Sequence, residues 1–86
     1  KIGKNCFIGH GTMFTNDDFK TGKINRNSKS YKKTVIGNEV LIGSNSTILP
    51  VYICSGSVIG AGSVVTKNIK KKGIYAGNPA KFLRKI

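Results

Sequence analysis

Residues 34–65, which read TVIGNEVLIGSNSTILPVYICSGSVIGAGSVV, decide the fold. An aliphatic side chain recurs here at intervals of six, apart from one interval of five, and the same spacing is found upstream. A period of six fits neither an α-helix nor a simple alternating strand. It is typical of short β segments wound into a coil, in which every repeat sends the same position into a narrow interior. These positions are Ile2, Ile8, Phe14, Ile36, Ile42, Ile48, Ile53, Ile59 and Val65.

From Ile8 onward, the residue two places before each aliphatic position points into the same interior, because side chains alternate along a strand. All of these residues are small or β-branched, as a tapering interior requires. A glycine follows five of the aliphatic positions, and we expect it to turn a corner with a positive φ. The pattern predicts an all-β fold, a parallel β-helix of hexapeptide repeats. The small residues are Cys6, Thr12, Thr34, Val40, Ser46, Val51, Ser57 and Ser63.

Two interruptions and one terminal segment depart from the repeat. Residues 17–34 are polar and basic, which predicts an excursion loop. The one interval of five, from Ile48 to Ile53, contains Pro50. Proline lacks a backbone N–H donor, which predicts locally irregular strand pairing there. Residues 67–86 are expected to leave the last coil and form a short C-terminal cap. Residues 1–86 therefore read as one domain, and we expect it to be the C-terminal part of a longer chain, or to bury its uncapped N-terminal end in an oligomer.

The amino-acid composition favours some classes of ligand and cellular location over others. The chain has 15 Lys and Arg against 3 Asp and Glu, a formal net charge of +12, but the basic residues are spread along it. We expect the charge to attract a phosphate-bearing small ligand rather than nucleic acid. No apolar run approaches the roughly 20 residues of a membrane span. Cys6 and Cys54 have neither a disulfide framework nor zinc-site spacing, so we expect them to be reduced and buried in a cytoplasmic protein.

The repeat resembles the left-handed β-helix of the hexapeptide-repeat acyltransferases. In that family three hexapeptides make one triangular coil, which implies about three coils here. Residues 59–67 (IGAGSVVTK) and 76–81 (AGNPAK) are similar to the C-terminal signature of bacterial acetyl-CoA-dependent acetyltransferases. Residues 8–17 (IGHGTMFTND) resemble a subset that acetylates nucleotide-linked amino sugars for surface polysaccharide, including the dTDP-3-amino-3,6-dideoxyhexose N-acetyltransferases.

The resemblance also implies where the site lies. Family members are homotrimers with active sites between neighbouring β-helices, where acetyl-CoA is the co-substrate and no metal takes part. It implies that small residues line the acetyl-CoA groove and that cations meet the CoA phosphates. The groove residues are Ser44, Ala61 and Ser63, and the cations are Lys67, Lys81 and Arg84.

Attack of an amine on a thioester needs a proton acceptor and stabilisation of the oxyanion. His10 is the only histidine, and imidazole ordinarily titrates near neutral pH, so it is the candidate base or else a substrate ligand. Asn16 is expected to bind the sugar or hold a carbonyl group. Asp17 is expected to orient His10 or to receive the amine proton.

Three other functions fit a β-helix. The γ-type carbonic anhydrases resemble it but bind zinc through three histidines, which one histidine per chain does not supply. An O-acetyltransferase acting on a sugar or serine hydroxyl stays open as the alternative. A non-catalytic β-helix module also stays open, although the intact segments at 59–67 and 76–81 argue against it.

Overall fold

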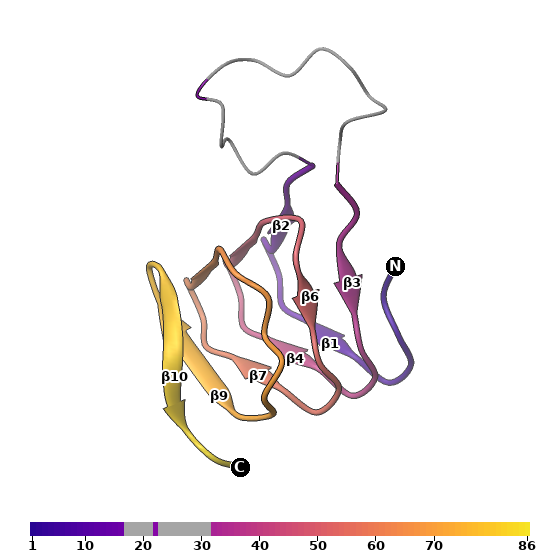
Figure 1. Ribbon diagram of the computed structural model, residues 1–86, viewed down its shortest axis with the longest axis vertical. Helices are drawn as coiled ribbons and strands as arrows, with labels where there is room; N and C mark the ends of the chain where they lie inside the picture. Colours follow the sequence, from indigo (N-terminus) through magenta and orange to yellow (C-terminus); the bar gives the residue numbers. More distant parts are fainter. Residues whose placement is uncertain (17–21, 23–31) are drawn as a thin grey trace.

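The computed structural model describes residues 1–16, 22 and 32–86. Short strands wind around a common axis, and from β1 to β9 the strands that follow one another in the chain lie on different faces (Figure 1). All neighbouring strands within the faces pair in parallel, except the last two. The five-stranded face has the order β1 (Phe7–Ile8), β4 (Leu41–Ile42), β7 (Val58–Ile59), β9 (Ile74–Gly77) and β10 (Ala80–Arg84). The three-stranded face has the order β2 (Met13–Phe14), β5 (Thr47–Ile48) and β8 (Val64–Val65). The two-stranded face consists of β3 (Val35–Ile36) and β6 (Tyr52–Ile53).

The period of six is confirmed by the register and by burial. Ile8 pairs with Ile42, and Ile42 pairs with Ile59 one coil later. The six aliphatic positions from Ile36 to Val65 are no more than 2 % exposed. The first coil is covered on one side only, so its aliphatic positions stay more accessible. The interior is thus a stack of aliphatic side chains, one on each face of each coil.

The glycines that follow the aliphatic positions have a different role from the one predicted. Their φ angles are not positive; the left-handed residue comes two places later, as at Asn45 (φ 61°) and Gly62 (φ 70°). A Cβ atom on Gly9 would lie 2.5 Å from the Ser44 backbone nitrogen, and one on Gly37 would lie 2.6 Å from the Ser55 nitrogen. The prediction of positive φ was therefore wrong, and these glycines are needed because successive coils approach so closely.

Three corners recur along the β-helix and are named here in chain order. The first corner comprises residues 3–6, 37–40 and 54–57, and the second comprises residues 9–12, 43–46 and 60–63. The third corner follows β2, β5 and β8 and includes residues 49–51 and 66–68. The shortened repeat passes through Pro50 at the third corner. Most of the predicted loop at 17–34 lies outside the described residues.

The β-helix continues beyond Val65, further than the sequence pattern predicted. Ile69 is 4 % exposed, and its backbone bonds to both Tyr52 (2.7 Å) and Cys54 (2.9 Å) of the preceding coil. β9 then extends the five-stranded face, and only β10 turns back as an antiparallel hairpin (Figure 1). Residues 67–86 are therefore partly coil and partly cap.

Aromatic packing fixes this hairpin. The rings of Tyr75 and Phe82 meet edge to face with centroids 5.5 Å apart. The Tyr75 hydroxyl donates to the Lys71 carbonyl at 2.6 Å, and the Lys71 ammonium lies 4.5 Å from the centroid of the Phe82 ring. Burial, with a smaller contribution from Cys54, raises the pKa of Tyr75, so the hydroxyl keeps its proton.

Both cysteines are free, but each is half-buried rather than fully buried. The Cys6 thiol donates to the Gly37 carbonyl at 3.2 Å, and the Cys54 sulfur lies 3.2 Å from the Ser57 hydroxyl. Each thiol therefore lies at the first corner and helps to close a turn.

Candidate functional site

The second corner brings together three of the predicted site residues, His10, Ser44 and Ala61. They hold the same place in successive coils, because β1, β4 and β7 are in register. The Asn45 N–H donates to the His10 carbonyl and the Gly62 N–H to the Ser44 carbonyl, both at 2.9 Å. All three residues are exposed. They therefore form an accessible column of small or polar residues along one edge of the β-helix.

Ser63 belongs to the same corner, but its side chain faces the interior. It is 0 % exposed; its hydroxyl donates to the Gly60 carbonyl at 2.6 Å and accepts from the Gly77 N–H at 3.2 Å. The expectation that the Ser63 side chain lines a groove is thus corrected. The reason is strand alternation, since Ser63 stands two places before the buried Val65.

The three predicted phosphate-binding cations lie on different elements. Lys67 is exposed at the third corner, whereas Lys81 and Arg84 are exposed on β10. Lys81 pairs with Ala76, and a Cβ on Gly60 would lie 3.0 Å from the Ala76 Cβ. Lys81 is consequently one strand away from the C-terminal end of the second-corner column, and Lys67 belongs to another edge.

The proposed base and sugar ligand also occupy different corners. His10 precedes β2 at the second corner, and Asn16 follows β2 at the start of the third. Five residues separate them, and strand β2 runs from one corner to the other. One chain therefore does not bring His10 and Asn16 together. Asp17, the remaining predicted residue, lies outside the described residues.

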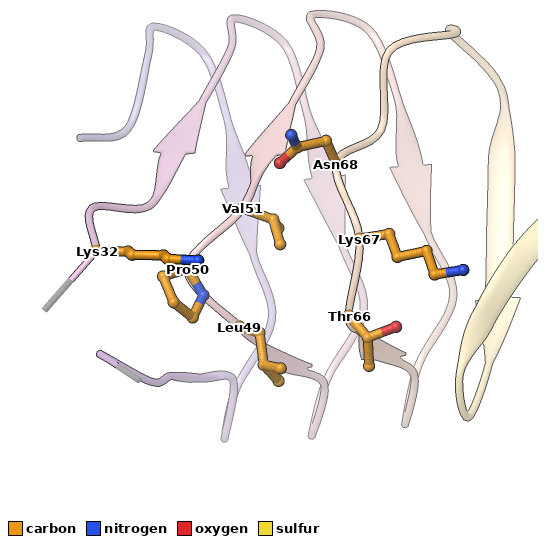
Figure 2. A pocket seen from close by; sticks show the side chains of 7 residues that line it. All are labelled: Lys32, Leu49, Pro50, Val51, Thr66, Lys67 and Asn68. Atoms are coloured by element: carbon orange, nitrogen blue, oxygen red, sulfur yellow. The ribbon is translucent and has the colours of Figure 1, made fainter. Parts of the chain in front are cut away.

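A pocket of about 660 Å³ opens at the third corner. Figure 2 shows it between successive coils, with the side chains of Lys32 and Lys67 on opposite sides of the view. The Asn68 side-chain oxygen accepts the Tyr52 N–H at 2.9 Å, which joins the two coils here. Of the residues that line this pocket, only Lys67 was predicted from the sequence to bind a ligand. The signal that was missed is that residues 49–51 and 66–68 hold equivalent places in the repeat. The lining residues are Lys32, Leu49, Pro50, Val51, Thr66, Lys67 and Asn68.

Residues 1–16, 22 and 32–86 hold neither a cluster of metal ligands nor a helix that could span a membrane. No three side chains of His, Cys, Asp or Glu in these ranges come close enough together to hold a metal ion. The same ranges contain no helix with the length and hydrophobicity needed to cross a bilayer.

Comparisons with known proteins agree with the coil geometry. Residues 1–12 and 33–67 match the family described as "Hexapeptide repeat of succinyl-transferase". The chain is 49 % identical over 72 residues to the bifunctional protein GlmU of Wigglesworthia glossinidia brevipalpis, covering 83 % of this chain and 14 % of the relative. It is 55 % identical over 53 residues to a probable macrolide acetyltransferase of Lysinibacillus sphaericus, covering 60 % of this chain and 29 % of the relative.

A solved acetyltransferase structure has a similar fold over nearly the whole length of this chain. A galactoside acetyltransferase in complex with coenzyme A superposes with a TM-score of 0.79 and 33 % identity, over 99 % of this chain and 44 % of that one. The chain spans less than a third of the length of the two curated relatives. On the family match and the superposition, the chain belongs to the hexapeptide-repeat transferase family, and its fold is the left-handed β-helix that the family resemblance implied.

Proposed function

We propose that the protein is an acetyltransferase that moves an acetyl group from acetyl-CoA to the amino group of a nucleotide-linked amino sugar used in surface polysaccharide. The observation that carries the acetyl-CoA part is the exposed column of His10, Ser44 and Ala61. It occurs in a chain 33 % identical to a galactoside acetyltransferase that was solved with coenzyme A. The assignment of an amino-sugar acceptor rests on residues 8–17, whose sequence resembles that of the amino-sugar N-acetyltransferases.

The proposed reaction is a direct acyl transfer. The sugar nitrogen attacks the thioester carbonyl carbon, an N–C bond forms, and the C–S bond then breaks to release CoA as its thiolate. The amine proton passes to His10, which acts as the base, and the oxyanion is held by backbone N–H groups of the second corner. Asp17 is proposed to orient His10 or to take that proton.

The sugar side of the site requires more than one chain. Because His10 and Asn16 lie at the two ends of β2, we propose that a neighbouring copy in a homotrimer completes the site. Asn16 then binds the sugar that is acetylated beside the partner's second corner. Symmetry repeats this arrangement three times in a closed trimer.

The basic surface suits both co-substrates. CoA and a sugar nucleotide carry phosphates, and a net charge of +12 attracts them. We propose that Lys81 and Arg84, next to the end of the column, and Lys67, at the third corner, contact phosphates of CoA. Both cysteines are free, which fits the reducing conditions of the cytoplasm, where we place the protein.

O-acetylation is the second candidate. It is favoured by the solved relative, because a galactoside presents hydroxyl groups to the acetyl donor. The same corner serves this chemistry, since a hydroxyl nucleophile also needs a base and an oxyanion site. Only the acceptor differs between the two candidates.

Radiolabelled acetyl-CoA decides between them. We expect label to pass to dTDP- or UDP-linked amino sugars and to give an alkali-stable amide. Transfer to the matching hydroxy sugars or to a galactoside, giving an alkali-labile ester, would select O-acetylation. A folded protein that binds acetyl-CoA but labels none of these acceptors would favour the non-catalytic module.

His10→Ala is expected to lower kcat/KM for the amino sugar by about 10²- to 10⁴-fold, the usual contribution of a general base. Dissociation of acetyl-CoA should stay unchanged, because the substitution leaves the Ser44 and Ala61 backbone in place. Steady-state kinetics with calorimetric titration of acetyl-CoA measure both quantities. A variant that keeps full activity would contradict the assignment of His10 as base, and a variant altered only in the KM for sugar would make His10 a substrate ligand.

A further inference from the structure

Backbone N–H groups at the second corner are left without acceptors. Among the described residues, the N–H groups of His10, Ser44 and Ala61 donate to no protein atom. They hold the same turn position in consecutive coils, so they repeat along the edge at the spacing of parallel strands, about 4.8 Å. An unpaired donor on an exposed edge is available to a ligand.

An inward-facing hydroxyl group fixes the direction of each of these donors. The Ser46 hydroxyl, on a residue that is 0 % exposed, donates to the Gly43 carbonyl at 2.8 Å and lies 3.2 Å from the Gly60 carbonyl. The Gly43 carbonyl therefore points into the coil. The C=O and N–H of a planar trans peptide point in opposite directions, so the Ser44 N–H points outward.

The same arrangement recurs in the coils on either side. The Thr12 hydroxyl donates to the Gly9 carbonyl at 2.8 Å, and the Ser63 hydroxyl donates to the Gly60 carbonyl at 2.6 Å. These bonds turn the N–H groups of the next residues, His10 and Ala61, outward as well. A hydroxyl side chain is thus present in all three coils at this corner.

The first corner has the same turn, but two of its three equivalent donors are capped. The Lys4 N–H donates to the Asn38 side-chain oxygen at 2.9 Å, and the Asn38 N–H donates to the Ser55 hydroxyl at 2.8 Å. The interior positions that correspond to Ser46 there are Cys6, Val40 and Ser57, so no hydroxyl series runs along this corner. The second corner therefore differs from the first in that the donor is open in all three coils, whereas of the equivalent described donors at the first corner only the Ser55 N–H lacks a protein acceptor.

We infer that Ser46 and Ser63 are positioning residues for acyl transfer. They hold the Gly43 and Gly60 carbonyls inward, which keeps the Ser44 and Ala61 N–H groups fixed as outward donors for the carbonyl oxygens of acetyl-CoA. Glycine at 9 and 43 keeps these donors uncovered, since a Cβ on Gly9 would lie 2.5 Å from the Ser44 nitrogen. The inference rests on the proposed function for the identity of the ligand, but not for the direction of the donors.

Alanine substitution of the buried serines tests the positioning role. Ser46→Ala and Ser63→Ala are each expected to lower kcat/KM by about 10- to 100-fold, less than the 10²- to 10³-fold lost with an oxyanion donor itself. Ser57→Ala is the matched control, because Ser57 is also 0 % exposed but lies at the first corner. It should lose less than about twofold in kcat/KM for a similar fall in melting temperature. Ser46→Thr should restore activity, since threonine already serves at position 12.

Two measurements decide the outcome. Equal losses of kcat/KM in Ser46→Ala and Ser57→Ala, after matching their melting temperatures, would overturn the positioning role and leave a structural one. Amide hydrogen exchange without ligand reports the donors directly: the Ser44 and Ala61 amides should exchange much faster than the capped Asn38 amide. Slow exchange at all three would overturn the inference. Fast exchange at Ser44 and Ala61 in a protein that binds no acetyl-CoA would support the donor geometry and count against the proposed function alone.

Discussion

Gly43→Val is expected to cause a large loss of stability by forcing two coils apart. A Cβ at this position would lie 2.6 Å from the Ala61 Cα and 2.9 Å from the Gly60 carbonyl carbon, both backbone atoms of the next coil. Backbone atoms cannot rotate away, so the coils must separate, at a cost of about 3 kcal/mol or more. That is a large part of the roughly 5–15 kcal/mol that stabilises a typical domain. Thermal and urea unfolding, followed by far-UV circular dichroism, measure the loss.

Gly62→Asn is the matched control for this prediction. Gly62 has a φ of 70°, and a Cβ there would meet nothing within 4 Å. Asn45 already holds the equivalent place one coil earlier with a φ of 61°, so asparagine is expected to change the free energy of unfolding by less than about 1 kcal/mol. Equal destabilisation by Gly43→Val and Gly62→Asn would contradict the view that coil spacing, rather than turn conformation, requires glycine at 43.

Ala61→Tyr is expected to weaken acetyl-CoA binding at least about 100-fold, or about 2.7 kcal/mol, without unfolding the protein. Ala61 is exposed, so a larger side chain finds room at the surface, but its ring covers the open N–H edge of the second corner. Calorimetric titration gives the dissociation constant, and a melting curve checks the fold.

Ser55→Tyr places the same ring at the equivalent turn position of the first corner. Ser55 is also exposed, and although the substitution removes the hydroxyl that accepts the Asn38 N–H at 2.8 Å, it leaves the second corner untouched. Acetyl-CoA should therefore bind this variant as it binds the unchanged protein. Loss of binding in Ser55→Tyr but not in Ala61→Tyr would move the acetyl-CoA site to the other corner.

The repeat alone was enough to predict the interior, whereas Ser44 and Ala61 of the exposed column were expected from the family resemblance. Spacing of six, with strand alternation, correctly turned Ile48 and Ile59 inward, because burial of one face specifies register strongly. The same rule places Ser63 inside. Its assignment to the groove came from its closeness in the chain to Ala61. That was wrong for the side chain, because the chain turns at Gly62 (φ 70°) and Ser63 then alternates in step with the buried Val65.

The sequence pattern did not predict the contacts between coils. The glycine role depends on the approach of Gly43 to Ala61, which lies 18 positions further along the chain. The third-corner pocket likewise depends on how residues 49–51 stack against residues 66–68. The burial of Ile69 was missed because it follows Val65 by four positions rather than six, so the period no longer identified it.

Addition of acetyl-CoA to the ¹⁵N-labelled protein, followed by amide chemical shifts, tests the central claim most directly. The claim is that the second corner is an edge of open backbone donors that binds acetyl-CoA. The account predicts saturable shifts that are largest at the amides of His10, Ser44 and Ala61, while those of Lys4, Asn38 and Ser55 stay nearly constant. Shifts centred on the first corner, or no shifts at millimolar acetyl-CoA, would contradict it.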